Sequence, residues 1–196
     1  MTGTYDWNPM PHKVDIKCPA CAEHSVFEFA VVVKIALKKD VPFFEKSDLF
    51  EYYLFKDSCG HNWHGATYYP NLHGGSTAAI RDLPEGYAPE NWNHSQYLIR
   101  NHGLDLGAFS CTHCQTRKPY ILQWPSDAFY SISYKGELLW AFNRESAVEL
   151  RDYIASNERK TEKYKWGSFL LHIPTLFKKQ NARDSVIKQI NRVLAC

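Results

Sequence analysis

The chain has 196 residues, of which 44% are hydrophobic and 15% aromatic, and its formal net charge is +2. This composition is sufficient for a packed core, and it excludes a disordered chain or a strongly polybasic one. The charge is uneven, because residues 144–196 carry 11 Lys and Arg against 6 Asp and Glu, whereas residues 1–143 carry 12 against 15. The C-terminal part could therefore meet an anionic partner, although a solvated helix face explains the same charge more simply.

The N-terminal segment has no basic stretch followed by an apolar one, so we expect no secretory signal. The longest apolar candidate, residues 27–37, is interrupted by Glu28 and Lys34 and is shorter than the roughly 20 residues that span a bilayer. Without export signals, the six cysteines are expected to be reduced thiols of a cytoplasmic protein that does not contact a membrane.

The first third of the chain is rich in Val, Ile and aromatic residues, which favour β-strands. Strands are expected at residues 14–17, 26–37 and 50–56, followed by an aromatic segment at 63–69. Residues 70–107 contain many Gly and Pro residues and are expected to form a long loop with a short helix near 92–101.

After residue 107 the strand pattern returns at 108–111 and 120–124, and a hairpin is expected at 129–134 and 137–141 around Lys135-Gly136. A helix is then expected from the N-cap Asn143 to about residue 158, and a second at 166–173, ended by Pro174. A third helix is predicted by apolar residues at helical spacing: Val186, Ile187, Ile190, Val193 and Leu194.

Two Cys-x-x-Cys pairs stand out, Cys18 with Cys21 and Cys111 with Cys114. Each pair lies between expected strands, and four thiolates suit a tetrahedral Zn²⁺ ion. The 89 residues between Cys21 and Cys111 exceed the spacing of familiar four-cysteine sites, which is about 15–20 residues. A long insertion costs little, because loop-closure entropy grows only with the logarithm of length. The pattern therefore predicts one structural zinc ion bound by these four cysteines.

A second group of metal-ligating side chains lies between the pairs: Cys59, His61, His64 and His73. These four residues could bind a second metal ion, since Cys and His donors suit zinc. Alternatively, Cys18 and Cys21 could bind the metal with Cys59 and a nearby histidine, His61 or His64. In the simplest interpretation, Cys59 is a small buried side chain and the histidines form ordinary hydrogen bonds.

A catalytic zinc site has three protein ligands and an open position, which the second group could supply. A zinc-dependent hydrolase or nuclease is therefore the alternative function, although no HExxH helix accompanies the nearby carboxylates Glu51 and Asp57. A thiol oxidoreductase is disfavoured, because neither CxxC pair opens a helix in a βαβ unit. We expect a protein that is not an enzyme.

Two further groups are candidates for nucleic-acid contact, with ordinary structural roles as the default. Basic residues near the last helix could meet phosphates: Lys178, Lys179, Arg183, Lys188 and Arg192. Aromatic residues of the first third could stack bases, although such residues usually belong to a core: Phe43, Phe44, Tyr52, Tyr53, Tyr68 and Tyr69.

Four segments together resemble a group of bacterial zinc-ribbon proteins of uncharacterised function: CPAC at 18–21, CTHC at 111–114, WPSDAFY at 124–130 and LWAFNRES at 139–146. The segment LRDYI at 150–154, Pro174 and Ala182-Arg183 look like the continuation of the same pattern. The resemblance covers most of residues 14–194, apart from about 40–105. It implies that the two CxxC pairs form one site and that the C-terminal region is helical, and the element at 59–64 departs from it.

The sequence therefore predicts an α+β protein. Residues 1–142 are expected to form a zinc-ribbon-like antiparallel β domain with an insertion at 40–107, and residues 143–196 a helical region packed on it. The expected function is non-catalytic, zinc-dependent recognition of a protein or a nucleic acid. The sequence indicates no oligomeric state.

Overall fold

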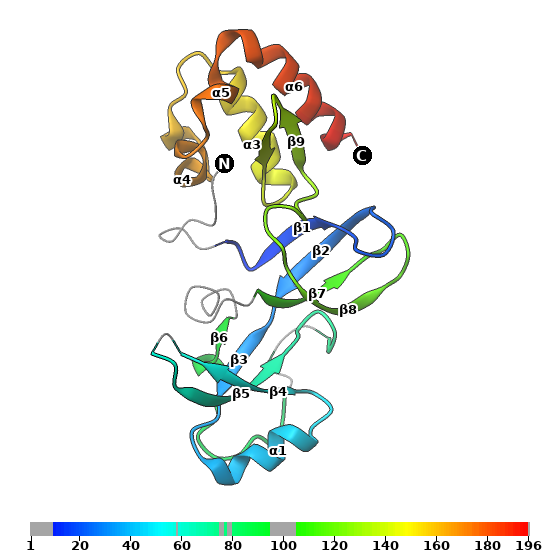
Figure 1. Cartoon of the computed structure of the whole chain (residues 1–196), viewed down its shortest axis with the longest axis vertical. Helices are drawn as coiled ribbons and strands as arrows, with labels where there is room; N and C mark the ends of the chain where they lie inside the picture. The colour runs from blue at the N-terminus through cyan, green and yellow to red at the C-terminus, as the bar shows by residue number, and fades with distance from the viewer. Residues whose placement is uncertain (1–9, 58, 75–76, 78–79, 95–104, 196) are drawn as a thin grey trace. The chain divides into compact units, whose positions relative to one another are not determined.

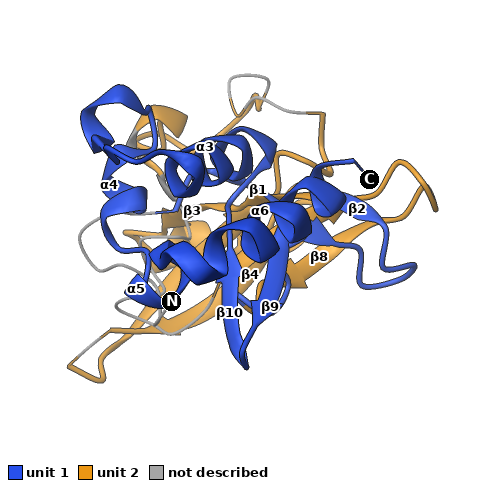
Figure 2. Ribbon diagram, turned by 90° about the horizontal axis from the view of Figure 1, so that it is seen from above, with its two compact units in different colours: residues 1–25, 124–196 blue, residues 26–123 orange. Residues whose placement is uncertain are grey.

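A computed structural model describes residues 10–57, 59–74, 77, 80–94 and 105–195, and it confirms a mixed α+β fold with antiparallel sheets and a C-terminal helix (Figure 1). The chain divides into two compact units, which Figure 2 distinguishes by colour. One unit comprises Met1–Ser25 with Trp124–Cys196, and the other comprises Val26–Gln123. The domain boundary expected at residues 142/143 and the packing of the helical region on the β domain stay predictions. Among the described residues, no helix has the length and apolar character needed to cross a membrane.

The first four-stranded sheet, called sheet A here, contains β1 (Lys13–Lys17), β2 (His24–Phe29), β7 (Leu106–Ser110) and β8 (Arg117–Ile121), in that order. The β2–β7 and β7–β8 pairs are antiparallel, and Phe27 lies opposite Phe109, which lies opposite Lys118. Strands were expected at 14–17 and 108–111, and both are confirmed. The strand expected at 120–124 begins and ends earlier, because its register is set by pairing with β7.

The second sheet, sheet B, contains β4 (Glu51–Lys56), β5 (Asn62–Tyr68), β3 (Val31–Lys34) and β6 (Asn93–His94), in that order. A single strand over residues 26–37 is wrong. The chain changes partners at Ala30, since β2 pairs with β7 in sheet A and β3 pairs with β5 in sheet B. The expected helix at 92–101 is wrong at Asn93–His94, which pair with β3, and residues 95–101 lie outside the described part of the chain.

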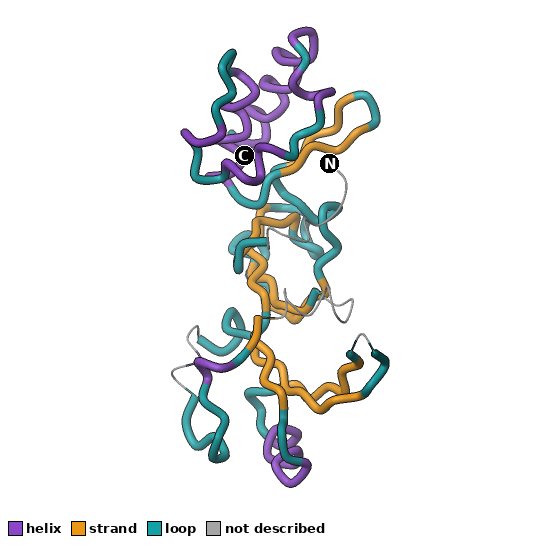
Figure 3. The backbone as a smooth tube through the Cα atoms, turned by 90° about the vertical axis from the view of Figure 1, so that its left-hand side faces the viewer, coloured by secondary structure: helices purple, strands orange, loops and turns teal. Residues whose placement is uncertain are grey.

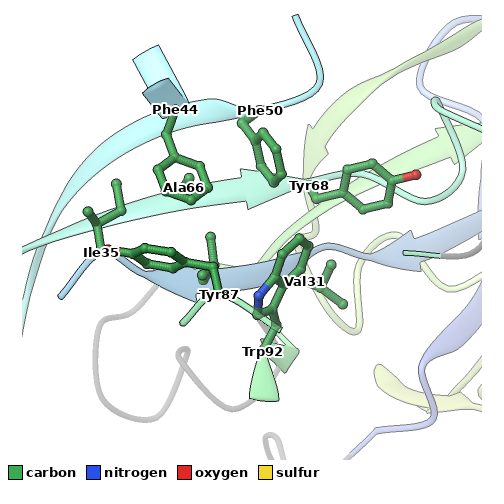
Figure 4. Packing of buried hydrophobic residues seen from close by; sticks show 9 residues of the cluster. Val31, Ile35, Phe44, Phe50, Ala66, Tyr68, Tyr87 and Trp92 are labelled. Carbon is green, nitrogen blue, oxygen red and sulfur yellow. The ribbon is translucent and has the colours of Figure 1, made fainter. Parts of the chain in front are cut away.

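One face of sheet B is covered by the helix α1 (Val41–Lys46), which the sequence analysis missed. This six-residue helix follows Asp40 and has a proline in its first turn, a favourable helix start. Its Phe44 is fully buried, and its ring packs edge-on against Phe50 at a centroid distance of 5.1 Å. Figure 4 shows these rings beside the sheet. The core on this face consists of Val31, Val33, Ile35, Phe44, Phe50, Ala66, Tyr68, Tyr87 and Trp92.

The base-stacking interpretation is wrong for three of the six aromatic residues proposed for it. Phe44, Tyr68 and Tyr69 are buried, with exposed fractions of 3% or less. Tyr69 belongs to a smaller apolar cluster on the other side of sheet B, formed by Ala30, Val32, Phe55, Tyr69, Leu106 and Ala108. These rings stabilise the sheet rather than lie free on its surface.

The unit that contains the C-terminus has a two-stranded hairpin, β9 (Ser131–Tyr134) with β10 (Glu137–Trp140). Lys135 and Gly136 have φ angles of 52° and 82°, as the two central residues of a type I′ turn require, and this confirms the predicted hairpin. Figure 3 shows the helices of this unit beside the hairpin: α3 (Arg144–Ala155), α4 (Gly167–Leu171), α5 (Thr175–Lys178) and α6 (Gln180–Leu194).

A capping box begins α3, as expected for Asn143. The Asn143 side chain accepts a hydrogen bond from the Ser146 backbone N–H at 2.9 Å, and the Asn143 N–H donates to the Ser146 hydroxyl at 2.9 Å. The expected second helix is confirmed as α4, followed by Pro174. The third helix, α6, begins at Gln180, earlier than the apolar pattern indicated. The pattern did not reveal this start, because the first turns of the helix have only one buried residue, Ala182.

Candidate metal centre

The two CxxC pairs lie in two turns of sheet A that have the same backbone structure. The first turn joins β1 to β2, and the Cys18 N–H donates to the Glu23 carbonyl at 2.7 Å. The second joins β7 to β8, and the Cys111 N–H donates to the Thr116 carbonyl at 3.0 Å. In both, the hydrogen bond spans five residues, so the first cysteine of each pair closes its turn.

The residue after the second cysteine has a left-handed backbone conformation in both turns. Ala22 has a φ of 64° and Gln115 a φ of 56°. This conformation is unfavourable for residues with a side chain, so it has to be held by its surroundings. The same conformation at the same position shows that the two cysteine turns, called knuckles here, are alike in backbone geometry.

The strand register explains why the knuckles meet despite 89 intervening residues. Val26 in β2 lies opposite Ser110 in β7, and the two strands are antiparallel. The turn before β2 and the turn after β7 therefore lie at the same end of the pair. The four Sγ atoms of Cys18, Cys21, Cys111 and Cys114 all lie within 4.8 Å of one another.

This cluster has the size and donor set that zinc requires. In a regular tetrahedron with zinc–sulfur distances of about 2.3 Å, the sulfur atoms are about 3.8 Å apart, which is inside the observed limit. Cys18 and Cys111 are buried, with exposed fractions of 3% and 2%, whereas Cys21 and Cys114 are half-buried. The four cysteines are thus placed to hold an ion at the ends of the strands of sheet A. Two of them, Cys18 and Cys111, are shielded from water.

Hydrogen-bond donors near the sulfur atoms suit thiolates rather than neutral thiols. The Ala20 N–H donates to Cys18 Sγ at 3.4 Å. The Thr116 hydroxyl lies 3.2 Å from Cys114 Sγ and can donate to it once the thiol has lost its proton. The five described cysteines, at 18, 21, 59, 111 and 114, form no disulfide.

The structure separates the members of the second candidate group. Cys59 lies in the turn between β4 and β5 and is exposed, so the interpretation of a buried Cys59 is wrong. Its N–H donates to Asp57 Oδ1 at 2.9 Å, and the His61 N–H donates to the same oxygen at 2.8 Å. His61 Nδ1 lies 3.4 Å from Asp57 Oδ2, and the histidine side chain is 81% exposed. Asp57 thus fixes the turn, and these hydrogen bonds, chiefly the one from the His61 N–H, lower its pKa.

His64 and His73 have separate partners. His64 Nδ1 lies 2.6 Å from the Tyr52 hydroxyl, and its ring is stacked on the Tyr52 ring. The His73 ring is stacked on Tyr68 at a centroid distance of 5.6 Å. Within the described residues, the only group of three or more metal-ligating side chains is the four-cysteine cluster. Cys59, His61, His64 and His73 are therefore not brought together, nor does Cys59 or a histidine join Cys18 and Cys21.

The basic residues near the C-terminus lie in α5, in α6 or between the two helices. Lys179, Lys188 and Arg192 are exposed, whereas Arg183 is half-buried and donates to the Asn157 side chain at 2.8 Å. An open depression on α6 is lined by Asp184, Ile187, Lys188, Asn191, Arg192 and Ala195. An acidic side chain is thus part of this surface, and nucleic-acid binding by Lys178, Lys179, Arg183, Lys188 and Arg192 stays a prediction.

Asp105, just before β7, is a titratable residue that sequence reasoning missed. Its Oδ1 atom is buried and has no hydrogen-bond partner, and burial raises the pKa of the carboxyl group to about 7. The sequence Leu104-Asp105-Leu106 carries a weak signal, a carboxylate between two apolar residues at the start of a strand.

Comparison of the chain with protein-family models, curated proteins and solved structures finds no match. The resemblance to bacterial zinc-ribbon proteins therefore stays a prediction, and the geometry of the cysteine cluster carries the functional argument.

Proposed function

We propose that the protein binds one Zn²⁺ ion through Cys18, Cys21, Cys111 and Cys114, and that this ion has a structural role in a recognition protein without catalytic activity. The observation that carries the proposal is the group of four Sγ atoms within 4.8 Å of one another, two of them on buried residues. Four thiolates complete the tetrahedral coordination of zinc. A water molecule or a substrate would have no position on the metal, so the ion would hold the two knuckles together instead of activating a reactant.

Recognition is the role that such a scaffold suits. The knuckle residues between and after the cysteines are largely exposed, among them Thr112, His113 and Gln115, and β8 is an edge strand of sheet A. A metal-fixed turn presents these side chains rigidly, which lowers the entropy lost on binding. The small net charge favours a protein partner over a nucleic acid, since non-specific nucleic-acid affinity depends on many cationic contacts. Reduced thiolates fit a cytoplasmic location, and we retain the bacterial zinc-ribbon group as the proposed family.

Native mass spectrometry of the intact, gently purified protein tests the metal. We expect one zinc ion per chain, lost in Cys111→Ser and retained in Cys59→Ser, which removes a described cysteine outside the cluster. A metal-free protein whose mass is lower by pairs of hydrogen atoms would show disulfides and would refute the zinc proposal. Two zinc ions per chain, with one of them lost in His61→Ala, would instead support the hydrolase alternative.

The class of partner is tested separately. Complexes isolated at low salt are challenged with increasing salt concentration. Steep dissociation of co-purified nucleic acid, weakened further by Lys188→Ala with Arg192→Ala, would support the nucleic-acid alternative. A stoichiometric protein complex that resists salt would support the proposal.

A further inference from the structure

We propose that β4, at the free edge of sheet B, pairs with β4 of a second copy of the chain, so that two molecules form a symmetric dimer. The two strands run antiparallel, and the two-fold axis passes through Leu54. The inference goes beyond the proposed function, because it concerns sheet B alone and does not depend on the zinc ion. It rests on the backbone of β4 and on the exposure of Leu54.

The alternation of hydrogen bonds in an antiparallel ladder shows which backbone groups of β4 face away from β5. Asp57, directly after β4, donates its N–H to the His61 carbonyl at 2.9 Å, in the same register as the β4–β5 pairs. Hydrogen-bonded and non-hydrogen-bonded pairs alternate along such a ladder. The outward N–H and C=O groups of the strand are therefore those of Tyr52, Leu54 and Lys56.

This outward side of β4 is open. The strand is the first in the order of sheet B, and within the described part of the chain it pairs only with β5. No described residue forms a hydrogen bond with the outward N–H or C=O of Tyr52 or Leu54. The middle of a regular six-residue strand is thus available for pairing, and such an edge is a template for a further strand.

Sheet A shows how this protein blocks strand addition at a free edge. The Cys111 N–H donates to the Thr116 carbonyl, so Arg117, Pro119 and Ile121 are the outward residues of β8. Arg117 and Pro119 are exposed, and proline has no N–H to offer an added strand. Proline and charged side chains are the usual means of preventing edge-to-edge pairing. In β4 there is no proline, and charged residues stand only at the two ends.

The central outward residue of β4 is instead a large apolar one. Leu54 is 54% exposed, although it lies in the middle of a strand. An exposed apolar side chain on an unprotected edge favours association with another strand. With the two-fold axis through Leu54, the two leucine side chains lie opposite each other on the same face of the joined sheets. Each then shields the other from water.

This position of the axis is the one that pairs all the outward residues with one another. Leu54 then lies opposite Leu54 of the copy, and Tyr52 lies opposite Lys56. An axis one residue nearer the start of the strand would place Lys56 opposite Phe50, whose N–H already donates to the Ser47 carbonyl at 3.3 Å. An axis one residue nearer the end would place Tyr52 opposite a residue beyond β4.

The aromatic side chains of β4 also fit a second copy of the same strand. In this register Tyr53 lies opposite Phe55 of the copy, in a pair whose side chains are close. Within one chain, the Tyr53 and Phe55 rings are already 5.8 Å apart, and Phe55 is stacked on Trp63 at 4.5 Å. Aromatic cross-strand pairs stabilise antiparallel sheets. The aromatic groups of the two copies would therefore join across the axis.

The charges permit pairing between identical chains. Antiparallel strands place the Lys56 end of one copy beside the Glu51 end of the other, so opposite charges approach. The carboxylate of the next residue, Asp57, accepts N–H groups of its own turn. Residues 26–123 carry 9 Lys and Arg against 10 Asp and Glu, a net charge of −1, so two copies of this unit repel each other little. The same surface on both molecules gives a closed two-fold interface.

Analytical ultracentrifugation of the full chain tests the proposal. We expect a concentration-dependent equilibrium between monomer and dimer. Leu54→Lys places two like charges opposite each other and should raise the dimer dissociation constant about tenfold or more. Ile121→Lys is the matched control, because Ile121 is an outward apolar residue of the other free edge and is 51% exposed. It should leave the constant within about twofold of the wild type. Circular dichroism establishes that both variants are folded.

Amide hydrogen exchange, resolved by NMR, tests the interface in the wild type and stays informative if Leu54→Lys fails to fold. The N–H groups of Tyr52 and Leu54 should exchange rapidly in dilute protein and about tenfold more slowly where the dimer predominates. The N–H groups of Tyr53 and Phe55 face β5 and should be protected at both concentrations. They serve as the internal control.

Several outcomes would overturn the proposal. One is a chain that stays monomeric up to about 1 mM, a range that includes very weak dimers. Another is a dimer that persists in folded Leu54→Lys, or one in which the Tyr52 and Leu54 amides stay unprotected, since the interface would then lie elsewhere. Protection of these amides in a monomeric chain bound to a different polypeptide would assign the edge to that partner instead. A metal-free protein that dimerises through Leu54 would refute the proposed zinc site and support this inference.

Discussion

The two sheets of this protein are stabilised in different ways. Sheet B has a contiguous core of nine buried residues, to which α1 contributes Phe44, whereas the knuckle end of sheet A places four cysteines together. An apolar core stabilises by removing surface from water, and a metal site by bonds that exist only when the ion is present. The stability of sheet B should therefore depend on packing, and the stability of the knuckles should depend on the proposed metal and on pH.

The largest effect should follow loss of the proposed zinc ion from the knuckles. Cys111→Ser leaves three thiolates, and structural zinc sites contribute apparent free energies of about 10 kcal/mol or more. We expect a large fall in melting temperature and rapid amide hydrogen exchange in β7 and β8, with slower exchange retained in β4 and β5. Cys59→Ser, which lies in the β4–β5 turn outside the cluster, should leave the melting temperature unchanged. Equal effects of both substitutions would contradict the comparison.

The core of sheet B should respond to truncation of its central ring. Phe44 is fully buried, and Phe44→Ala should lower the free energy of unfolding by about 3–5 kcal/mol. Chemical denaturation of the zinc-loaded protein measures the change. Phe43→Ala is the control, because the neighbouring ring on the same helix is 36% exposed and should matter much less. Loss of zinc from Phe44→Ala would show that the sheets are not stabilised separately.

A pH-dependent effect is expected from Asp105. Its pKa in the folded protein, about 7, lies above the ordinary value of 3.8, so folding favours the protonated form. Its destabilising contribution therefore grows as the pH rises from about 4 to about 7. Asp105→Asn should raise the free energy of unfolding by about 1–2 kcal/mol at pH 8, less than the full shift implies because the residue is only partly buried, and by little near pH 4. A gain independent of pH would contradict this explanation.

The smallest effect concerns the β4–β5 turn. Its Asp57 accepts the N–H groups of Cys59 and His61, and its pKa is lowered, first by the His61 hydrogen bond. A lowered carboxyl pKa stabilises the fold above the ordinary pKa and stops doing so as the pH falls through the folded value. Asp57→Asn should therefore lower the melting temperature slightly at pH 7 and not below about pH 3. A reduced zinc content in this variant would contradict the separation of the two cysteine environments.

Local signals were predictable from the sequence. The CxxC spacing indicated the knuckles, Lys135-Gly136 the hairpin, and Asn143 the start of α3, because each depends on residues close in the chain. The same reasoning could not predict that the strand expected at 26–37 is divided at Ala30 into β2 and β3. Residues 26–37 are apolar almost throughout, and only pairing with distant strands determines which part joins which sheet. Cys59 was misassigned because spacing to its neighbours carries no information on exposure.

The break at Ala30 has a consequence for how this chain can diverge. The Ala30 N–H donates to the Leu106 carbonyl at 3.1 Å, so the chain leaves sheet A and returns to it at neighbouring positions. A segment whose two ends adjoin can be lengthened, shortened or exchanged without moving the strands that flank it. Residues 31–105 can therefore change in length without altering the register of β2 against β7, and with it the geometry of the four cysteines.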